Sequence, residues 1–253
     1  MTDLTNTVAV VTGAGTGIGE AIARALATAG ARVAVTNRSP EPATAVRDDI
    51  VAQGGDAIAL RLDISSRDSI AEGLDAVISQ YGRIDVMVNN AGISGEIPFM
   101  DVTGDDWDRM LDTNGLGTLM CMQEVAKRMA PDGGKIINLT SITGRQANPT
   151  FAHYSASKFA INSLIQSGAR ALASRNITVM GLAPGIVATP LWNGVVADDE
   201  ARAAKMAAYE KRILLRRVSV SDDLAPAAVF LASSGADYMT GHVMTVDGGL
   251  VLV

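Results

Sequence analysis

The sequence predicts an α/β fold: a single domain with a doubly wound, mostly parallel sheet of seven strands and helices on both faces. Two observations lead to this prediction. Short apolar runs alternate with stretches of helical spacing along the whole chain, which is typical of a parallel sheet covered by helices. Hydrophobic residues make up 48% of the 253 residues and aromatic residues only 4%, as expected where small side chains let helices pack closely on a sheet.

The strands are predicted where apolar runs are short and continuous, because such runs suit strands buried on both faces. In chain order they cover residues 8–12, 32–36, 57–62, 84–88, 135–139, 177–182 and 242–246. Between them, apolar residues recur with the period of a helix. The predicted helices cover about 18–29, 41–53, 66–81, 105–129, a stretch around Tyr154 that ends near Ser174, 194–212 and 222–231.

Local signals mark several helix ends. Gly30 is placed to end the first helix, and Ser65 or Ser66 to cap the third. Pro226 lies early in the last helix, where it should remove a hydrogen bond or shift the helix start. No linker, internal repeat or low-complexity tract interrupts the pattern, so residues 1–253 are expected to form one domain.

Composition also limits the partners. The formal net charge is −6 and no run of Lys or Arg stands out, which argues against nucleic acid or an anionic membrane as the main partner. Cys121 is the only cysteine, so an intrachain disulfide is excluded and a buried thiol is expected. The polar N-terminus and the lack of a long apolar run indicate a cytoplasmic protein.

A glycine-rich turn lies between the first predicted strand and the first predicted helix. It reads Thr-Gly-Ala-Gly-Thr-Gly-Ile-Gly over residues 12–19. Glycine allows a tight turn and lets backbone N–H groups approach a phosphate, and a helix N-terminus adds partial positive charge. The turn lacks the Gly-Lys-Ser/Thr ending of a Walker phosphate loop. Its position therefore predicts a Rossmann-type dinucleotide site, with a purely structural turn as the alternative.

The end of the second predicted strand bears on the choice of cofactor. An acidic residue there would bind the adenosine ribose hydroxyls, but the chain reads Thr36-Asn37-Arg38. Arg38 can pair with a 2′-phosphate and Asn37 can hydrogen-bond to it, so NADP(H) is favoured over NAD(H). Alternatively, Arg38 is solvated or pairs with Glu41, and Asn37 serves the ribose of NAD(H).

Tyr154 and Lys158 are four residues apart, a spacing that places two side chains on one face of a helix. A nearby positive charge favours the phenolate and is expected to lower the pKa of Tyr154 toward the working pH. By chance alone, however, such a pair is more often a packed tyrosine beside a solvated lysine.

Together these features resemble the short-chain dehydrogenase/reductase (SDR) family, and the resemblance extends over essentially the whole chain. Besides the glycine-rich turn and the Tyr-x-x-x-Lys pair, five further motifs match in the correct order. They are Asn89-Asn90-Ala91-Gly92, Asn114, Ser141, Pro184-Gly185 and Asp247-Gly248-Gly249. The family often has Gly-Arg before its last helix, where this chain has Arg216-Arg217, so the shape of that loop is open.

The resemblance implies catalytic roles for four residues. Tyr154 would be the general acid/base, and Ser141 would hydrogen-bond the reacting oxygen. Lys158 would bind the nicotinamide ribose and tune Tyr154, and Asn114 would hold a water that relays protons. Taken alone, Ser141 can also cap a turn and Asn114 a helix.

The resemblance also implies a set of cofactor contacts along the chain and a homotetramer. The contacts would be Gly13, Thr16, Gly17, Ile18, Gly19, Asn37, Arg38, Asp63, Ile64, Asn90, Gly92, Tyr154, Lys158, Pro184, Gly185, Val187 and Thr189. Neither histidine has neighbours in the sequence that suggest a metal site, so no metal is expected.

The substrate region is expected at a lid over about residues 190–215, where Trp192 would wall the pocket beside Ser141 and Tyr154. Four polar residues suit a diol, polyol or sugar: Ser94, Thr143, Gln146 and His153. The predicted function is an NAD(P)-dependent oxidoreductase that interconverts a small-molecule secondary alcohol and its ketone. The alternatives are a 3-ketoacyl-carrier-protein reductase, against which the acidic balance argues, and a catalytically silent dinucleotide-binding sensor.

Overall fold

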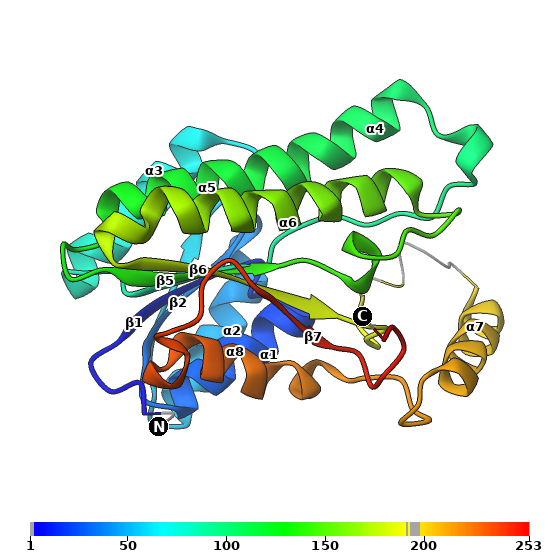
Figure 1. Cartoon of the computed structure of the whole chain (residues 1–253). Coiled ribbons are helices and arrows are strands. Elements are labelled where there is room, and N and C mark those ends of the chain that lie inside the picture. Colours follow the sequence, from blue (N-terminus) through cyan, green and yellow to red (C-terminus); the bar gives the residue numbers. More distant parts are fainter. Residues whose placement is uncertain (1–2, 191, 193–197, 253) are drawn as a thin grey trace.

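A single seven-stranded sheet organises the chain in the computed structural model, which describes residues 3–190, 192 and 198–252 (Figure 1). Every pair of neighbouring strands is parallel, and the order across the sheet is β3-β2-β1-β4-β5-β6-β7. The strands are β1 (Val8–Thr12), β2 (Arg32–Asn37), β3 (Asp56–Arg61), β4 (Val86–Asn89), β5 (Gly134–Leu139), β6 (Ile177–Pro184) and β7 (Val243–Val246).

Helices cover both faces of the sheet, as the sequence predicts. Figure 1 shows α1, α2 and α8 on one face and α3, α5 and α6 on the other. The helices are α1 (Gly17–Thr28), α2 (Pro40–Ala52), α3 (Arg67–Tyr81), α4 (Gly104–Met110), α5 (Gly117–Arg128), α6 (Ala152–Leu172), α7 (Asp199–Arg212) and α8 (Ala225–Ala232). Alternate residues of β1 enter the two cores, with Ala9 and Val11 in one and Val8 and Val10 in the other. This alternation explains why β1 is apolar throughout.

The predicted single helix over 105–129 is interrupted in the structure. A π-helical segment, Leu111–Leu116, joins α4 to α5, and the three run on as one long rod (Figure 1). Gly117 follows it, where a Cβ would lie 3.0 Å from the Ile64 carbonyl oxygen. Apolar spacing could not reveal a π-helical turn, because it lengthens the helix by one residue without breaking it.

Other boundaries differ by a few residues. The fourth strand begins at Val86 rather than at 84, and the sixth extends to Pro184. Ser66, not Ser65, caps α3 by accepting a hydrogen bond from the Ser69 N–H at 3.2 Å. Pro226 lies in the first turn of α8, where its missing N–H costs no helical hydrogen bond. Of the predicted helix over 194–212, the first residues lie outside the described ones and the helix is seen from Asp199.

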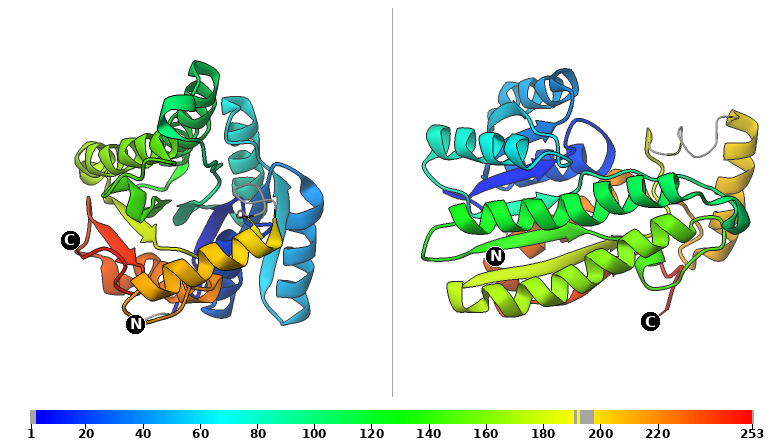
Figure 2. Two further views of the ribbon diagram at one scale, coloured as in Figure 1. Left: turned by 90° about the vertical axis from the view of Figure 1, so that its right-hand side faces the viewer. Right: turned by 90° about the horizontal axis from the view of Figure 1, so that it is seen from above.

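The strand order reverses direction between β1 and β4, and this reversal determines where a ligand crevice lies. From β1 the chain winds toward β2 and β3, and from β4 it winds the other way. The loops that leave these strands diverge and open a crevice at their carboxyl ends, the usual ligand position in such sheets. Figure 2 shows α7 lying across this end of the molecule.

Candidate active site

The glycine-rich turn joins β1 to α1 and depends on its glycines. Gly13 and Gly17 have φ angles of 62° and 61°, a region that glycine adopts without strain. A Cβ on Gly19 would lie 2.4 Å from the Gly13 carbonyl oxygen, so any larger residue would move the turn. Thr16 is exposed just before α1. The turn therefore leaves backbone N–H groups free to approach a phosphate at a helix N-terminus, and it fits a dinucleotide.

Asn90 and Thr12 hold the turn against β4. The Asn90 side chain donates to the carbonyl oxygens of Thr12 at 2.9 Å and Gly13 at 3.1 Å. The Thr12 hydroxyl accepts from the N–H groups of Asn90 at 3.0 Å and Ala91 at 3.1 Å. The sequence predicted Asn90 as a cofactor contact, and the structure shows that its amide group joins the ends of β1 and β4 beneath the glycine-rich turn.

Arg38 and Asn37 lie at the end of β2, at the edge of the crevice. Arg38 is exposed, and the Asn37 side chain donates to the Ser39 carbonyl oxygen at 3.0 Å. Within the described part of the chain Arg38 has no ion pair with Glu41 or another carboxylate. The guanidinium is therefore available to a phosphate group, and the alternative in which it pairs with Glu41 is not seen.

Asp63 and Ile64 follow the neighbouring strand β3. The Asp63 carboxylate accepts hydrogen bonds from the Ser65 hydroxyl at 2.6 Å and the Ser65 N–H at 3.0 Å. These bonds hold the pKa of Asp63 below its ordinary value, and the positive charge of Arg38 contributes. Ile64 is buried beside it. Asp63, one of the two predicted adenine-side residues, is thus close enough to the predicted phosphate-binding arginine to feel its charge.

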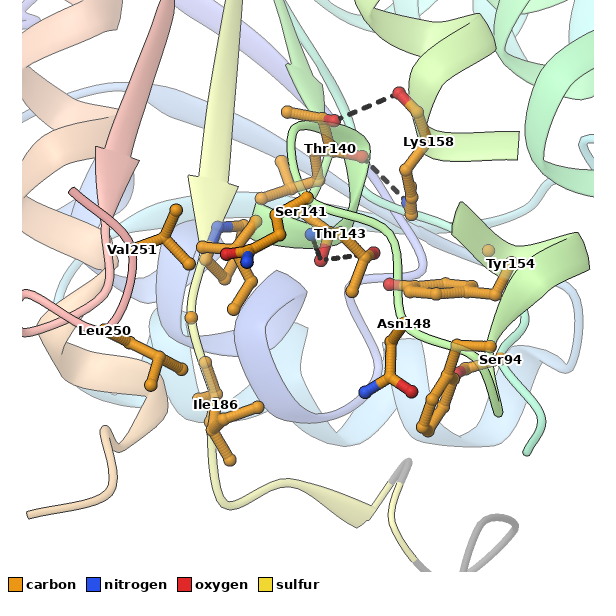
Figure 3. Close-up of a pocket in the computed structure, with 18 of the residues that line it drawn as sticks. Ser94, Thr140, Ser141, Thr143, Asn148, Tyr154, Lys158, Ile186, Leu250 and Val251 are labelled. Atoms are coloured by element: carbon orange, nitrogen blue, oxygen red, sulfur yellow. Dashed lines mark hydrogen bonds between the residues drawn. The ribbon is translucent and has the colours of Figure 1, made fainter. Parts of the chain in front are cut away.

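Ser141, Tyr154 and Lys158 converge in one cavity of about 490 Å³. Ser141 follows β5, whereas Tyr154 and Lys158 lie in the first two turns of α6. Figure 3 shows the Tyr154 hydroxyl directed toward Ser141 and Thr143. The Ser141 hydroxyl accepts from the Thr143 N–H at 3.1 Å and the Thr143 hydroxyl at 3.0 Å, which fixes its orientation toward the cavity.

The protonation of this pair differs from the prediction. Burial raises the pKa of Tyr154 to about 12, and the hydrogen bond with Ser141 offsets only part of this rise. Burial also lowers the pKa of Lys158 to about 8. The ammonium group lies 5.5 Å from the centroid of the Tyr154 ring and donates to the Leu139 carbonyl oxygen at 3.0 Å. The expected net fall in the pKa of Tyr154 toward the working pH is therefore not found in the chain by itself, because burial of the phenol dominates its pKa.

Asn114 lies in the π-helical segment and is buried. Its amide oxygen accepts from the Ile93 N–H at 2.8 Å, and its amide nitrogen donates to the Ile93 carbonyl oxygen at 2.9 Å and the Ser157 hydroxyl at 3.0 Å. The side chain thus fixes the loop after β4. A Cβ on Gly92 would lie 2.9 Å from the Asn114 amide oxygen, which explains the glycine at that position.

The loop after β6 closes the cofactor side. Pro184, Gly185, Val187 and Thr189 all line the cavity. A Cβ on Gly17 would lie 3.5 Å from Thr189 Cβ, so this loop lies directly over the glycine-rich turn. The cavity also includes residues of that turn and of the loop after β4, namely Ile18, Asn90 and Gly92.

The predicted substrate contacts are only partly found in the wall of the cavity. Of the predicted polar contacts, Ser94, Thr143 and Gln146 line the cavity, but His153 does not. The imidazole is fully buried with no hydrogen-bond partner for either nitrogen in the described residues. The expectation that His153 contacts the substrate is therefore wrong. His153 directly precedes Tyr154 on α6, and adjacent helix positions diverge by about 100°, so its imidazole enters the interior instead of the cavity.

Trp192 also lines the cavity, as predicted. Its indole N–H donates to the Val187 carbonyl oxygen at 2.9 Å, and its ring centroid lies 6.1 Å from that of Tyr209 in α7. The remaining residues of the predicted lid segment up to 197, Leu191 and 193–197, lie outside the described ones.

Several cavity residues were not predicted from the sequence. They are Ile93, Leu139, Thr140, Ile142, Ala147, Asn148, Pro149, Phe151, Ile186, Tyr209, Arg212, Leu250 and Val251. Leu250 and Val251 belong to the C-terminal tail that follows β7. The tail turns into the cavity because the Asp247 carboxylate accepts hydrogen bonds from the Gly249 N–H at 2.9 Å and the Val251 N–H at 2.8 Å. The Asp-Gly-Gly motif at residues 247–249 is the sequence feature from which this turn of the tail could have been predicted.

The chain was compared with known proteins. Residues 13–251 match the family described as enoyl-(acyl carrier protein) reductase. A 3-oxoacyl-(acyl-carrier-protein) reductase of Staphylococcus epidermidis is 39% identical over 249 residues, which is 98% of this chain and 100% of that protein. Another, from Synechocystis, is 37% identical over 255 residues and covers 100% of both.

Solved structures agree with these matches. A short-chain type dehydrogenase/reductase from Mycobacterium marinum superposes with a TM-score of 0.91 at 35% identity, covering 98% of this chain and 97% of that one. The chain belongs to the short-chain dehydrogenase/reductase family. A gluconate 5-dehydrogenase from Burkholderia cenocepacia, in complex with NADP and tartrate, gives the same TM-score at 36% identity, covering 98% of this chain and 96% of that one. The motif-based prediction is confirmed, and the SDR is an oxidoreductase of a family that uses NAD(P).

One departure from the family pattern is resolved by the backbone. Arg216, which stands where SDR chains often have glycine, adopts a φ angle of 56°, in the left-handed region that favours glycine. Arg217 pairs with both carboxylate oxygens of Asp223 at 2.6 Å. The loop therefore keeps the left-handed residue that a glycine would supply, and Arg217 is not simply solvated.

The described residues contain no cluster of His, Cys, Asp and Glu that could hold a metal ion. A search of the same residues finds no helix with the length and apolarity needed to cross a membrane. Cys121 is buried, as expected, and burial raises the pKa of its thiol to about 12.

Proposed function

We propose that this SDR is an NADP(H)-dependent alcohol dehydrogenase or carbonyl reductase that interconverts a secondary alcohol and its ketone. The observation that carries the proposal is the convergence of the Ser141 hydroxyl, the Tyr154 phenol and the Lys158 ammonium in a cavity that continues to the glycine-rich turn. Silent binding of a dinucleotide would need the turn but not these three groups.

The roles of these residues follow from their chemistry. In reduction, Tyr154 donates its proton to the carbonyl oxygen, and in oxidation it accepts one from the hydroxyl. Ser141 donates a hydrogen bond to that oxygen, which stabilises the charge it gains. The nicotinamide supplies or accepts the hydride when it is bound. A raised pKa suits Tyr154 as the proton donor of the reduction, because the phenol stays protonated across the physiological range, whereas the oxidation needs the phenolate, which this pKa disfavours.

Lys158 and Asn114 act behind Tyr154. The Lys158 ammonium would hydrogen-bond the hydroxyls of the nicotinamide ribose and stabilise the phenolate that forms after proton transfer. Asn114 holds Ile93 and contacts Ser157 one position before Lys158. We propose that Asn114 positions Ile93 and Ser157 beside a path along which a water molecule returns a proton to Tyr154.

NADP(H) is proposed over NAD(H) because Arg38 is exposed and uncommitted at the end of β2. A guanidinium pairs with a phosphate through two hydrogen bonds. The end of β2 itself carries no carboxylate, and the nearby Asp63 carboxylate is engaged by Ser65. The NADP in the related gluconate 5-dehydrogenase structure is consistent with this choice. We propose the remaining cofactor residues predicted from the sequence as the other contacts of NADP(H).

We propose that residues 190–215 form a lid over the substrate. Of these residues, the structure describes 190, 192 and 198–215. Through Trp192, Tyr209 and Arg212 this segment forms one wall of the cavity. A homotetramer is proposed as well, because Trp107 on α4 and Phe159 on α6 are 45% and 46% exposed, and apolar side chains on long helices suit a subunit interface.

A 3-oxoacyl thioester reductase is the second candidate. Relatives of that name are 37% to 39% identical, and much of the cavity wall is apolar, including Ile142, Ile186, Leu250 and Val251. The net charge of −6 opposes docking of an acidic carrier protein, which favours a free small molecule.

The decisive experiment is a panel of ketones, diols, polyols and 3-oxoacyl thioesters with NADPH and NADH, followed by the absorbance of the reduced nicotinamide. We expect turnover with NADPH in preference to NADH. Tyr154→Phe should lower turnover by about a thousandfold while the affinity for NADPH stays within a few-fold. Full activity of this variant would contradict the mechanism, and a preference for NADH would contradict the role of Arg38.

A further inference from the structure

One face of α7 is directed at the cavity. Lys205, Tyr209 and Arg212 are spaced i, i+4 and i+7, so their side chains share one face of the helix. Tyr209 and Arg212 line the cavity, and Lys205 lies beside two aromatic rings of the cavity wall, those of Phe151 and Trp192. Lys205 lies 5.9 Å from the Trp192 ring centroid, and the Tyr209 ring lies beside the Trp192 ring. This otherwise unburied helix therefore presents two cations to the substrate region.

The first cation is already neutralised. The Lys205 ammonium forms an ion pair with Glu96, whose other oxygen accepts from the Thr150 hydroxyl at 2.7 Å. Lys205 and Glu96 are 26% and 23% exposed. The pair joins α7 to the loop after β4, so neither charge is left for a ligand.

The second cation has no partner in the described chain. The Arg212 guanidinium lies 5.8 Å from the Tyr209 ring centroid, but no carboxylate pairs with it among residues 3–190, 192 and 198–252. The helix positions that could reach it, three and four residues earlier, are Tyr209 and Ala208. Glu210 is two positions away, which places it about 200° around the helix.

Nearby acidic groups are also engaged elsewhere. Glu96 is paired with Lys205, and Asp247 accepts two backbone hydrogen bonds from the C-terminal tail. Residues 191 and 193–197 contain no charged side chain. Apart from Lys158, Arg212 is the only charged side chain among the described residues that line the cavity. The substrate side therefore carries one positive charge that the protein does not balance.

We propose that Arg212 binds a carboxylate of the substrate, so that the preferred substrates are hydroxy acids and their oxo acids rather than neutral alcohols and ketones. An arginine can bind a carboxylate through two parallel hydrogen bonds, which fixes orientation as well as adding affinity. The carboxylate takes no part in the bond changes, which occur at the carbonyl carbon and oxygen beside Ser141 and Tyr154. This inference rests on the proposed reaction and narrows its substrate class.

The test uses oxo acids of three to six carbons, each paired with its methyl ester, as substrates of the full-length enzyme with NADPH. The wild type should reduce the acid with the higher kcat/KM. Arg212→Gln should raise KM for the acid about tenfold to a hundredfold, the loss expected for one charge-assisted contact. KM for the ester and kcat for both substrates should change less than threefold.

Lys211→Gln is the matched control. It removes the same charge from the same last turn of α7, but Lys211 does not line the cavity. A basic residue that only stabilises the helix C-terminus would affect acid and ester alike in both variants. Equal effects of the two variants, or a wild type without preference for the acid, would overturn the proposal.

A binding measurement separates this inference from the proposed reaction. The acid and its ester are titrated calorimetrically into wild type and Arg212→Gln, each saturated with NADP⁺. Binding of the acid that depends on Arg212 without any turnover would contradict the proposed reaction and support the carboxylate site. Turnover of neutral ketones, with the acid bound no more tightly than its ester, would support the proposed reaction and contradict the carboxylate site.

Discussion

The cofactor side and the substrate side of this SDR are built differently. On the cofactor side, Asn90 and Thr12 cross-link two strands under a turn in which glycines are in close contact with backbone atoms. On the substrate side, α7 has no buried residue, and it is joined to the body through the Lys205–Glu96 ion pair and the rings of Trp192 and Tyr209.

This contrast separates two requirements. Binding the constant cofactor and moving a proton need fixed geometry, which buried hydrogen bonds and close packing provide. Choosing a substrate needs only a wall of suitable shape and charge, and exposed side chains on a helix can change without disturbing the fold. Substitutions on the first side should therefore lower turnover, cofactor affinity or stability, whereas substitutions on the second side should mainly change KM for the substrate.

Lys158→Met should show the largest effect, because it removes the charged group nearest to the proposed proton donor. Turnover should fall by roughly a hundredfold or more. Stability should rise, since the pKa of Lys158 falls from 10.5 to about 8 on folding, which corresponds to about 3 kcal/mol against burying the charge. The variant also loses the hydrogen bond to the Leu139 carbonyl oxygen, which costs about 1 kcal/mol of stability. Urea unfolding at pH 7 should therefore show a net gain of about 2 kcal/mol in unfolding free energy.

The gain should depend on pH in a defined direction. Between pH 8 and 10.5 the unfolded wild type binds more protons at Lys158 than the folded protein does, so this group makes wild-type stability rise with pH. The advantage of Lys158→Met should therefore shrink across that window. Lys211→Met, at an exposed position, serves as the control and should change neither turnover nor the pH slope. A variant less stable than wild type at every pH would refute the buried-charge argument.

Gly19→Ala should come next. The new Cβ would lie 2.4 Å from both the Gly13 carbonyl oxygen and the Asn90 amide nitrogen, so the turn must shift. We expect a loss of about 1–3 kcal/mol in unfolding free energy and a fall in NADPH affinity on the order of a hundredfold, read by fluorescence titration. Gly104→Ala, where a Cβ would meet nothing within 4 Å, should leave both unchanged. Equal behaviour of the two variants would show that the turn tolerates displacement.

Glu96→Gln should have the smallest effect. It removes the partner of Lys205 while keeping a side chain of the same size, and a half-buried pair of this kind is worth about 1 kcal/mol. KM for the substrate should change only a few-fold, with NADPH affinity and stability nearly unchanged. Glu210→Gln, on the exposed side of α7, should be silent in steady-state kinetics. A hundredfold loss for Glu96→Gln would mean that the substrate side is as rigidly specified as the cofactor side.

The contrast between the closely packed cofactor side and the exposed substrate side also explains which features could be predicted from the sequence. The strand pattern and the glycine-rich turn were predictable, because buried parallel strands and close backbone contacts constrain residue type locally. The positions of Tyr154, Lys158 and Ser141 followed from motif spacing. Arg212 and the C-terminal Leu250 were missed, because their proximity depends on where α7 and the tail lie in space. The pKa of Tyr154 was misjudged because a sequence shows the neighbouring charge but not the loss of water.

The cross-link between Asn90 and Thr12 spans 78 residues of chain, and this has a consequence for how the protein folds. Closing so long a loop costs chain entropy that is recovered only when β4 pairs with β1. During synthesis, the glycine-rich turn emerges long before the residue that holds it. A nascent chain that ends before β4 therefore lacks the residue that holds the glycine-rich turn, and a nicotinamide cofactor of the proposed kind could not stabilise the first half of the molecule until the sheet has been joined across its centre.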